Sequence, residues 1–232
     1  MTGRSPFDDL AARTWPEVDG AVTVAVPVGS LEQHGPHLPL DTDTTIAVAV
    51  ASALPNVQVA PPVAYGASGE HQSFAGTVSV GTDALELVLL EYGRSIFTWA
   101  ERVVFVNGHG GNAVALANSV QRLRFEGRDV AWLPCAVPGA DAHAGRTETS
   151  LMLHLVPDRV RMERAAAGTV TPIADLLPAL RSAGVAAASE SGVLGDPTGA
   201  TAAEGADLFG RLVARSVAAI VRWCPDGSGV LR

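Results

Sequence analysis

The chain has 232 residues, 47% of them hydrophobic and 5% aromatic, with a formal net charge of −8 at pH 7. This length fits one α/β domain with a substantial core, so we expect a single domain over residues 1–232. The charge argues against nucleic-acid or acidic-membrane partners. The acidic amino-terminal segment and lack of a long apolar run predict a soluble protein without a signal peptide or membrane span. The two cysteines, Cys135 and Cys224, lie far apart without CxxC spacing, so a reduced, cytoplasmic compartment is the default expectation.

Strand-like and helix-like segments alternate along the chain. The apolar runs that predict strands are residues 21–29, 57–63, 102–108 and 129–135. The segments that predict helices are residues 44–54, 84–100 and 113–127, one beginning near Thr147, and 204–224. This alternation predicts a three-layer α/β/α fold with a mostly parallel sheet. The Gly-, Pro- and Ser-containing tail after the last helix is expected to be loose.

The first predicted strand leads into GSLEQHGPHLPLDTDT, residues 29–44, which carries Glu32, His34 and Asp43. Residues two apart on an extended segment project to the same side, so Glu32 and His34 can converge on one point. Carboxylates and imidazoles together suit Zn, Mn or Fe better than Ca or Mg, and an aspartate could bridge two ions. The competing interpretation is that Asp43 or Thr44 only caps the following helix.

A second segment, AYGASGEHQSFAGTVS at 64–79, supplies Glu70, His71 and Ser73. Long loops rich in turn formers commonly shape substrate pockets. We expect these three residues to line the pocket or to support metal ligands, with Glu70 holding the second ring nitrogen of a ligand histidine.

The segment ERVVFVNGHGGN, residues 101–112, reads as a buried strand and a Gly-rich turn that carries His109 into a helix. Catalytic residues of open α/β sheets gather at the carboxyl ends of strands, so His109 is expected to face the same crevice as the first cluster. A Gly-rich turn could instead form the anion nest of a binding protein without hydrolytic activity. Such a nest gains little from a central histidine.

Residues 138–158 deliver His143 and Glu148 from a Gly-containing loop at the start of a helix. An acidic residue there also interacts favourably with the helix dipole, which is a second explanation for Glu148. His154, within an apolar run, is expected to be packed or to lie at an interface. An enzyme with a Ser or Cys nucleophile is disfavoured, because no GxSxG is present and Cys135 lies in an apolar, strand-like context.

Five segments in order resemble the creatininase family of metal-dependent amidohydrolases: GSLEQHGPHLPLDTD, YGASGEHQSFAGTVS, VNGHGGN, HAGRTETSLML and GDPTGATAAEG. The resemblance runs from about residue 20 into the last helix. Within the family, the chain looks most like the branch that processes the mycofactocin precursor peptide. The alternative that the family offers is hydrolysis of a small cyclic amide or a formamide.

The resemblance implies two divalent ions, Zn, Fe or Mn. Glu32 and His109 would be ligands of one ion, His34 a ligand of the other, and Asp43 the bridge between them.

One position departs from the family pattern. Creatinine-cleaving members carry a glutamate ligand two residues after the histidine, and this sequence has Gly111 there. Glu148, in the ETS motif shared with the family, is the expected replacement. The departure puts creatinine in doubt as the substrate.

Two ions about 3.5–4 Å apart would hold a water and polarise the amide carbonyl, so the expected nucleophile is metal-bound hydroxide. His143 is the expected proton shuttle to the leaving nitrogen. The implied substrate is the modified precursor peptide, which would lose a Val–Tyr-derived C-terminal dipeptide during redox-cofactor biosynthesis. The family also implies a homo-oligomer, hexameric or larger, with Trp15 and Trp99 as candidate interface residues.

Overall fold

The computed structural model describes residues 10–18 and 22–232. Most of the acidic amino-terminal segment therefore lies outside the described residues. Among the helices that are described, none is long and apolar enough to cross a membrane.

Within the described residues, four parallel strands form one sheet in the order β2-β1-β3-β4. The strands are β1 (Thr23–Val28), β2 (Val57–Val59), β3 (Arg102–Asn107) and β4 (Val130–Pro134). β1 and β3 pair from Thr23↔Arg102 to Val28↔Asn107, so they end level with each other. All carboxyl ends therefore lie at one edge of the sheet, which confirms the predicted parallel α/β arrangement.

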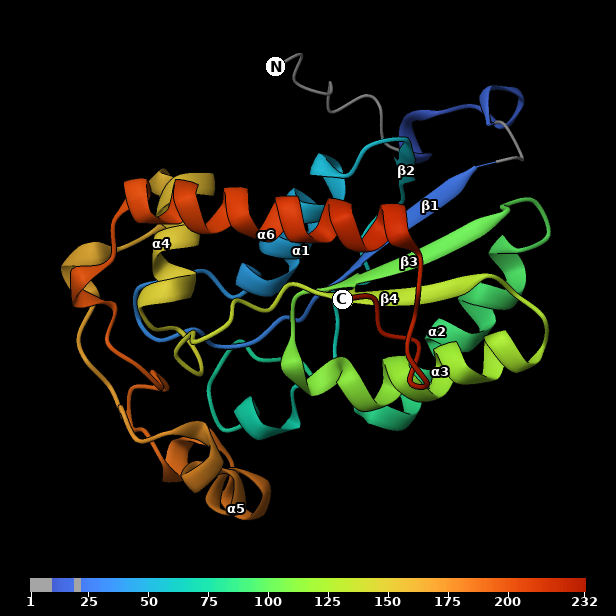
Figure 1. Ribbon diagram of the computed structural model, residues 1–232. Coiled ribbons are helices and arrows are strands. Elements are labelled where there is room, and N and C mark those ends of the chain that lie inside the picture. The colour runs from blue at the N-terminus through green and yellow to red at the C-terminus, as the bar shows by residue number, and fades with distance from the viewer. Residues whose placement is uncertain (1–9, 19–21) are drawn as a thin grey trace.

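Helices cover both faces of this sheet (Figure 1). One face carries α1 (Thr42–Ala53), α4 (Arg146–Leu155) and α6 (Ala202–Arg222), and the other carries α2 (Thr82–Ile96) and α3 (Ala113–Phe125). Side chains alternate along a strand, so Val104 and Val106 of β3 join the first core while Val103 and Phe105 join the second. Burial of each such side chain contributes about 1.5–3 kcal/mol.

One helix was not predicted from the sequence. α5 (Ile173–Ala183) has Pro178 inside it, which disguises the helical pattern. It lies away from the sheet (Figure 1) and packs through Leu180 against Val185 and Leu194.

The expectation of a loose carboxyl-terminal tail is wrong. The amide of Leu231 donates to the carbonyl of Trp132 at 2.9 Å, and Val230 and Leu231 are both buried. The two apolar side chains extend the cores beside β4, which fixes a segment whose composition suggested a free end.

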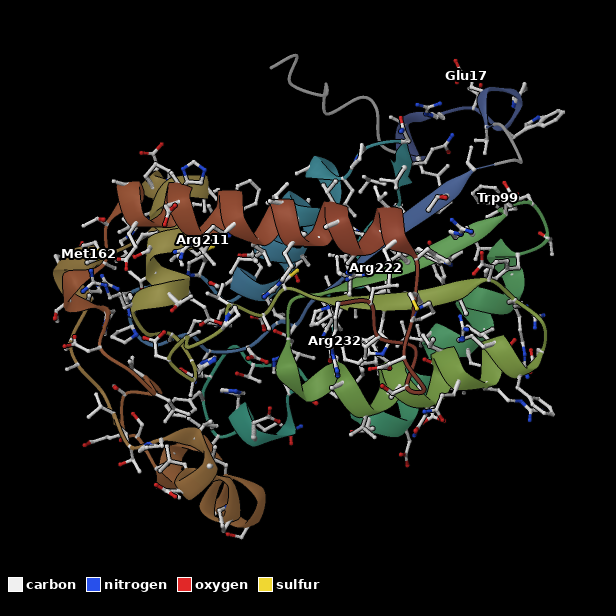
Figure 2. All side chains as sticks on the ribbon, viewed as in Figure 1. Glu17, Trp99, Met162, Arg211, Arg222 and Arg232 are labelled. Carbon is white, nitrogen blue, oxygen red and sulfur yellow. The ribbon has the colours of Figure 1, made fainter. Side chains whose placement is uncertain are left out.

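The two tryptophans considered for interfaces differ in environment. Trp15 is 87% exposed. Trp99, labelled in Figure 2, is partly buried against the core beneath α2 and α3. Packing within the chain is therefore sufficient to explain Trp99.

Candidate metal centre

The predicted site residues meet at the carboxyl edge of the sheet. They come from the loop after β1, the first turn of α1, the loop before α2, the turn after β3, the loop after β4 and the first turn of α4. In chain order they are Glu32, His34, Asp43, Glu70, His71, His109, His143 and Glu148. Close approach of these segments requires Gly108, because a Cβ atom there would collide with the carbonyl group of Asp43.

Asp43 occupies the centre of the cluster. Its Oδ1 lies 3.3 Å from Nε2 of His34, and its Oδ2 lies 3.2 Å from Nδ1 of His109. The cap residue of α1 is Asp41, and Asp43 belongs to the first turn of the helix. The capping interpretation of Asp43 is therefore wrong, and its carboxylate is free to face the two rings.

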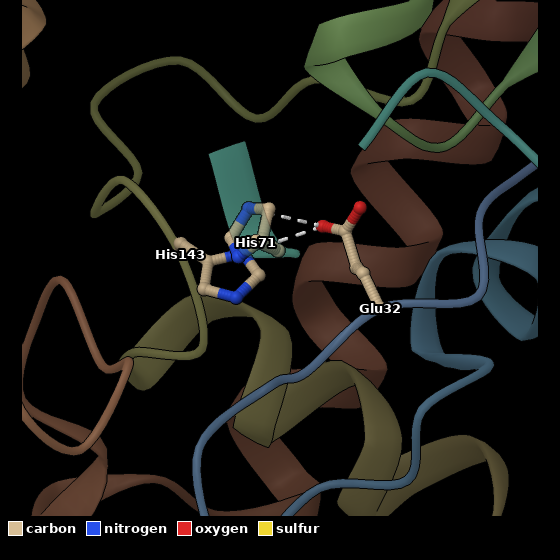
Figure 3. A group of neighbouring side chains, drawn as sticks. All are labelled: Glu32, His71 and His143. Atoms are coloured by element: carbon tan, nitrogen blue, oxygen red, sulfur yellow. Dashed lines mark ion pairs between the residues drawn. The ribbon is translucent and has the colours of Figure 1, made fainter. Parts of the chain in front are cut away.

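Three overlapping sets of side chains could each hold a metal ion, with all donor atoms of a set within 4.8 Å of one another. The sets are Glu32, Asp43 and His109; His34, His143 and Glu148; and Glu32, His71 and His143. The last set is drawn in Figure 3, where His71 and His143 lie side by side and both face Glu32.

The charges in the cluster fit a cation. Glu32 is fully buried, and neither of its carboxylate oxygens has a hydrogen-bond partner among the described residues. Such an arrangement is costly unless a positive charge is supplied. Burial alone lowers the pKa of His34, but Asp43 and the nearby glutamates outweigh burial and raise that pKa to about 10. The same balance raises the pKa of His109 well above its ordinary value. The carboxylates thus draw positive charge into the site, and mixed imidazole and carboxylate donors suit a divalent transition metal.

Glu148 enters the same crevice from α4. Its Oε2 lies 3.9 Å from Nε2 of His34 and accepts a hydrogen bond from the amide of Ala144 at 2.6 Å. Burial raises the pKa of Glu148 to about 7. Glu148 is therefore beside the donor set of His34 and His143, although the sequence also allowed it a purely helix-stabilising role.

Position 111 has no room for a side chain. A Cβ atom there would collide with the carbonyl oxygen of Ala67 and the ring of His109, and would lie 3.0 Å from Oε1 of Glu70. The same Glu70 oxygen lies 3.6 Å from Nε2 of His109. Glu70 therefore brings a carboxylate from another loop to the side of His109 that Gly111 leaves open.

A cavity of about 950 Å³ opens onto the cluster. Its lining includes five residues of the cluster: Asp43, His71, His109, His143 and Glu148. Ser73 also lines the cavity, but it is exposed and belongs to none of the three donor sets. The apolar lining includes Val114, Ile173, Leu180, Val185 and Leu194.

Two buried residues of the site were missed from the sequence. Asn112 donates to the carbonyl of Gly29 at 2.9 Å and accepts from the amide of Ala67 at 2.9 Å, which ties three loops together. Gln33 contacts both His71 and His143. The alternation that pointed to Glu32 and His34 assigns Gln33 to the opposite side, so its role could not be seen without the loop structure.

Cys135 is poorly suited to act as a catalytic nucleophile. Burial raises the pKa of the Cys135 thiol to about 12, so it holds no thiolate near neutral pH. His154, expected to be packed or interfacial, is exposed, and its ring lies 5.7 Å between centroids from the ring of Phe209 at an interplanar angle of 45°.

The creatininase family model, described as creatinine amidohydrolase, matches residues 11–220. The chain belongs to the creatininase family. Membership makes this creatininase-family protein a hydrolase of amide bonds.

Curated relatives and solved structures agree with this membership. A mycofactocin precursor peptide peptidase of Mycolicibacterium smegmatis is 59% identical over 217 residues, covering 90% of this chain and 88% of the relative. A creatinine amidohydrolase of Pseudomonas putida is 29% identical over 192 residues, covering 65% of this chain and 73% of the relative.

Two of the solved structures carry a metal in their descriptions. A creatininase described with Mn has a TM-score of 0.74 and 26% identity, covering 92% of this chain and 97% of that chain. A mutant creatininase of Zn-Zn type has a TM-score of 0.76 and 26% identity, covering 94% of this chain and 98% of that chain.

Proposed function

We propose that this creatininase-family protein is a peptidase that releases the modified C-terminal Val–Tyr dipeptide unit from the mycofactocin precursor peptide during redox-cofactor biosynthesis. The similarity to the M. smegmatis peptidase supports this substrate, since it extends over nine-tenths of the chain. The observation that carries the chemistry is the position of Asp43, with one carboxylate oxygen toward His34 and the other toward His109.

The donor sets support two divalent ions, of Zn, Fe or Mn. Glu32 and His109 would hold one ion, His34 and Glu148 the other, and Asp43 both. Bound ions would supply a Lewis acid for the amide carbonyl and lower the pKa of a water molecule toward neutrality.

His143 is the proposed proton shuttle. Its Nε2 donates a hydrogen bond of 2.7 Å to the backbone carbonyl of Gln33, so in the neutral ring Nδ1 carries a lone pair. Nδ1 faces Glu32 at 3.8 Å, inside the cluster. From there His143 would take a proton from the attacking water and deliver it to the leaving nitrogen as the C–N bond breaks.

The cavity supports a peptide-sized substrate. Its volume of about 950 Å³ accepts more than a single small ring. The apolar wall formed by Ile173, Leu180 and Val185 would receive the Val and Tyr side chains, and Ser73 would contact polar parts of the chain.

We also propose that residues 1–232 work as a single amidohydrolase domain, because all the segments that carry site residues meet at the carboxyl edge of one sheet. A homo-oligomer, hexameric or larger, is proposed from the family, with the exposed Trp15 as an interface candidate.

The test is incubation of the metal-loaded protein with the modified precursor peptide, followed by mass spectrometry. Release of the C-terminal dipeptide unit, its loss after chelation and its recovery with added Zn or Mn are expected. Creatinine and a formamide substrate serve as comparisons in parallel reactions. Turnover of either small amide without peptide cleavage would replace the peptidase proposal with a small-amide hydrolase.

A further inference from the structure

The side-chain amide of Gln33 has a fixed orientation in the buried loop between Glu32 and His34. Its Oε1 accepts a hydrogen bond from the amide of Gly35 at 2.8 Å, and its Nε2 donates to the carbonyl of Gly192 at 3.1 Å. A backbone N–H can only donate and a carbonyl can only accept, so the amide cannot be flipped without losing both bonds.

This orientation determines the tautomer of His71. The second hydrogen of Gln33 Nε2 points to Nδ1 of His71 at 2.8 Å, so Nδ1 is the acceptor in that bond. The proton of the neutral ring is then on Nε2. Nε2 faces the cluster, 3.4 Å from Oε1 of Glu32 and 4.0 Å from Oε1 of Glu70.

His143 presents the opposite group to the same space. Its Nε2 gives its hydrogen to the backbone carbonyl of Gln33, and its bare Nδ1 faces the cluster. Nε2 of His143 also lies 3.1 Å from Nε2 of Gln33. This contact is not a hydrogen bond, because both atoms are donors and their hydrogens point to other acceptors. The two rings lie side by side (Figure 3), 4.3 Å apart between centroids. They therefore offer one donor and one acceptor to the cluster.

We propose that His71 is a second catalytic residue, whose Nε2–H donates a hydrogen bond to the oxygen of the scissile amide, and that Gln33 is the positioning residue that fixes this donor. The inference rests on the amide hydrolysis proposed above. As water attacks and negative charge develops on the amide oxygen, His71 keeps its proton. The proton from water passes to Nδ1 of His143 and then to the leaving nitrogen as the C–N bond breaks. Hydrolysis therefore needs no other acid.

The competing role for His71 is that of a metal ligand together with Glu32 and His143. A ligand nitrogen must carry a lone pair, which would move the proton of His71 to Nδ1. Nδ1 would then face the donor Nε2 of Gln33 at 2.8 Å, and two donors would oppose each other. The fixed amide of Gln33 therefore favours the hydrogen-bonding role over the ligand role.

The ring protons are tested by ¹⁵N NMR of protein labelled in histidine, both metal-free and loaded with Zn. We expect the signal of His71 to show a protonated Nε2 and an unprotonated Nδ1 in the loaded protein. His71→Phe identifies the signal. A proton on Nδ1 of His71 in the loaded protein would overturn the proposal. The NMR measurement needs no turnover. It therefore determines the tautomer of His71 even if the wild-type protein does not cleave the precursor and the proposed function is wrong.

Kinetics test the catalytic part. His71→Phe should lower kcat about 10²–10³-fold, as loss of one donor to a developing oxyanion does, while metal per chain is unchanged. His71→Gln, whose amide can still donate, should recover part of the loss. Gln33→Met should lower kcat, and Gln33→Met with His71→Phe should be no slower than His71→Phe alone, because the two residues act through one hydrogen bond. Loss of a metal ion in His71→Phe, or additive losses in the double variant, would overturn the proposal.

Discussion

The hydroxyl of Ser30 donates a hydrogen bond of 2.6 Å to Oδ2 of Asp43, from a position where both side chains are buried. This bond orients the carboxylate so that its two oxygens face different histidines. Ser30→Ala should therefore weaken metal binding by about 10–100-fold, the usual cost of losing a group that orients a ligand. Competition with a chelator measures the change, and the exposed Ser95→Ala is a matched control. Unchanged affinity in Ser30→Ala would mean that Asp43 is held by other contacts.

Glu148 is proposed to complete the second ion site. Glu148→Ala should reduce metal content from about two ions per chain to about one, because His34 would lose its nearby carboxylate. Elemental analysis of the purified protein measures this. Glu163→Ala, which removes an exposed glutamate, controls for the loss of charge. Two ions in both variants would exclude Glu148 as a ligand, and one or none in the wild type would exclude a two-ion centre.

Gly111 and Gly110 give a matched pair of substitutions. Gly111→Ala should destabilise the protein by about 1–3 kcal/mol, because the added methyl group meets the Ala67 carbonyl and the ring of His109. Gly110→Ala adds the same methyl group where no described residue other than its chain neighbours lies within 4 Å. Denaturant unfolding of the two variants should show a loss of stability only in Gly111→Ala. Equal stabilities would show that the Ala67 loop shifts at little cost.

Glu126 should contribute to stability in a pH-dependent way. Its hydrogen bonds with Arg94, together with Arg128 and Arg122, lower the pKa of Glu126 from 4.5 to about 2. Because the folded pKa is depressed, the contribution is present above about pH 4.5 and is lost as the pH falls toward 2. Glu126→Gln should lower the Tm at pH 7, and its difference from wild type should shrink across that acidic range. A Tm difference that is constant with pH would exclude this contribution.

The convergence of the site segments could be predicted from the sequence. Glu32, His34 and His109 each follow an apolar strand-like run, and parallel strands bring such positions to one edge of a sheet. Asp43 could be interpreted in two ways, because an acidic residue in the first turn of a helix serves either as a cap or as a site residue. Its three-dimensional position decided between them.

Other features depended on contacts that no local pattern reveals. Glu70 and Gly111 are 41 positions apart in the sequence, and only the folded loops show that they lie next to each other. The orientation of Gln33 depends on Gly192, which is far away in the sequence. α5 was missed because Pro178 interrupts its pattern, although its apolar face packs in a normal way.

The bonds of Asn112 connect Gly29, Ala67 and Asn107, so the loops that bear the metal-binding side chains are fastened to one another. α5 lines the cavity without taking part in these bonds. The edge that carries the proposed metal ligands and the wall proposed to receive the substrate are therefore held by different contacts. Changes on α5 could redirect the protein to a new peptide end while the ion-binding chemistry stays intact, a division that would let one hydrolytic centre serve many substrates.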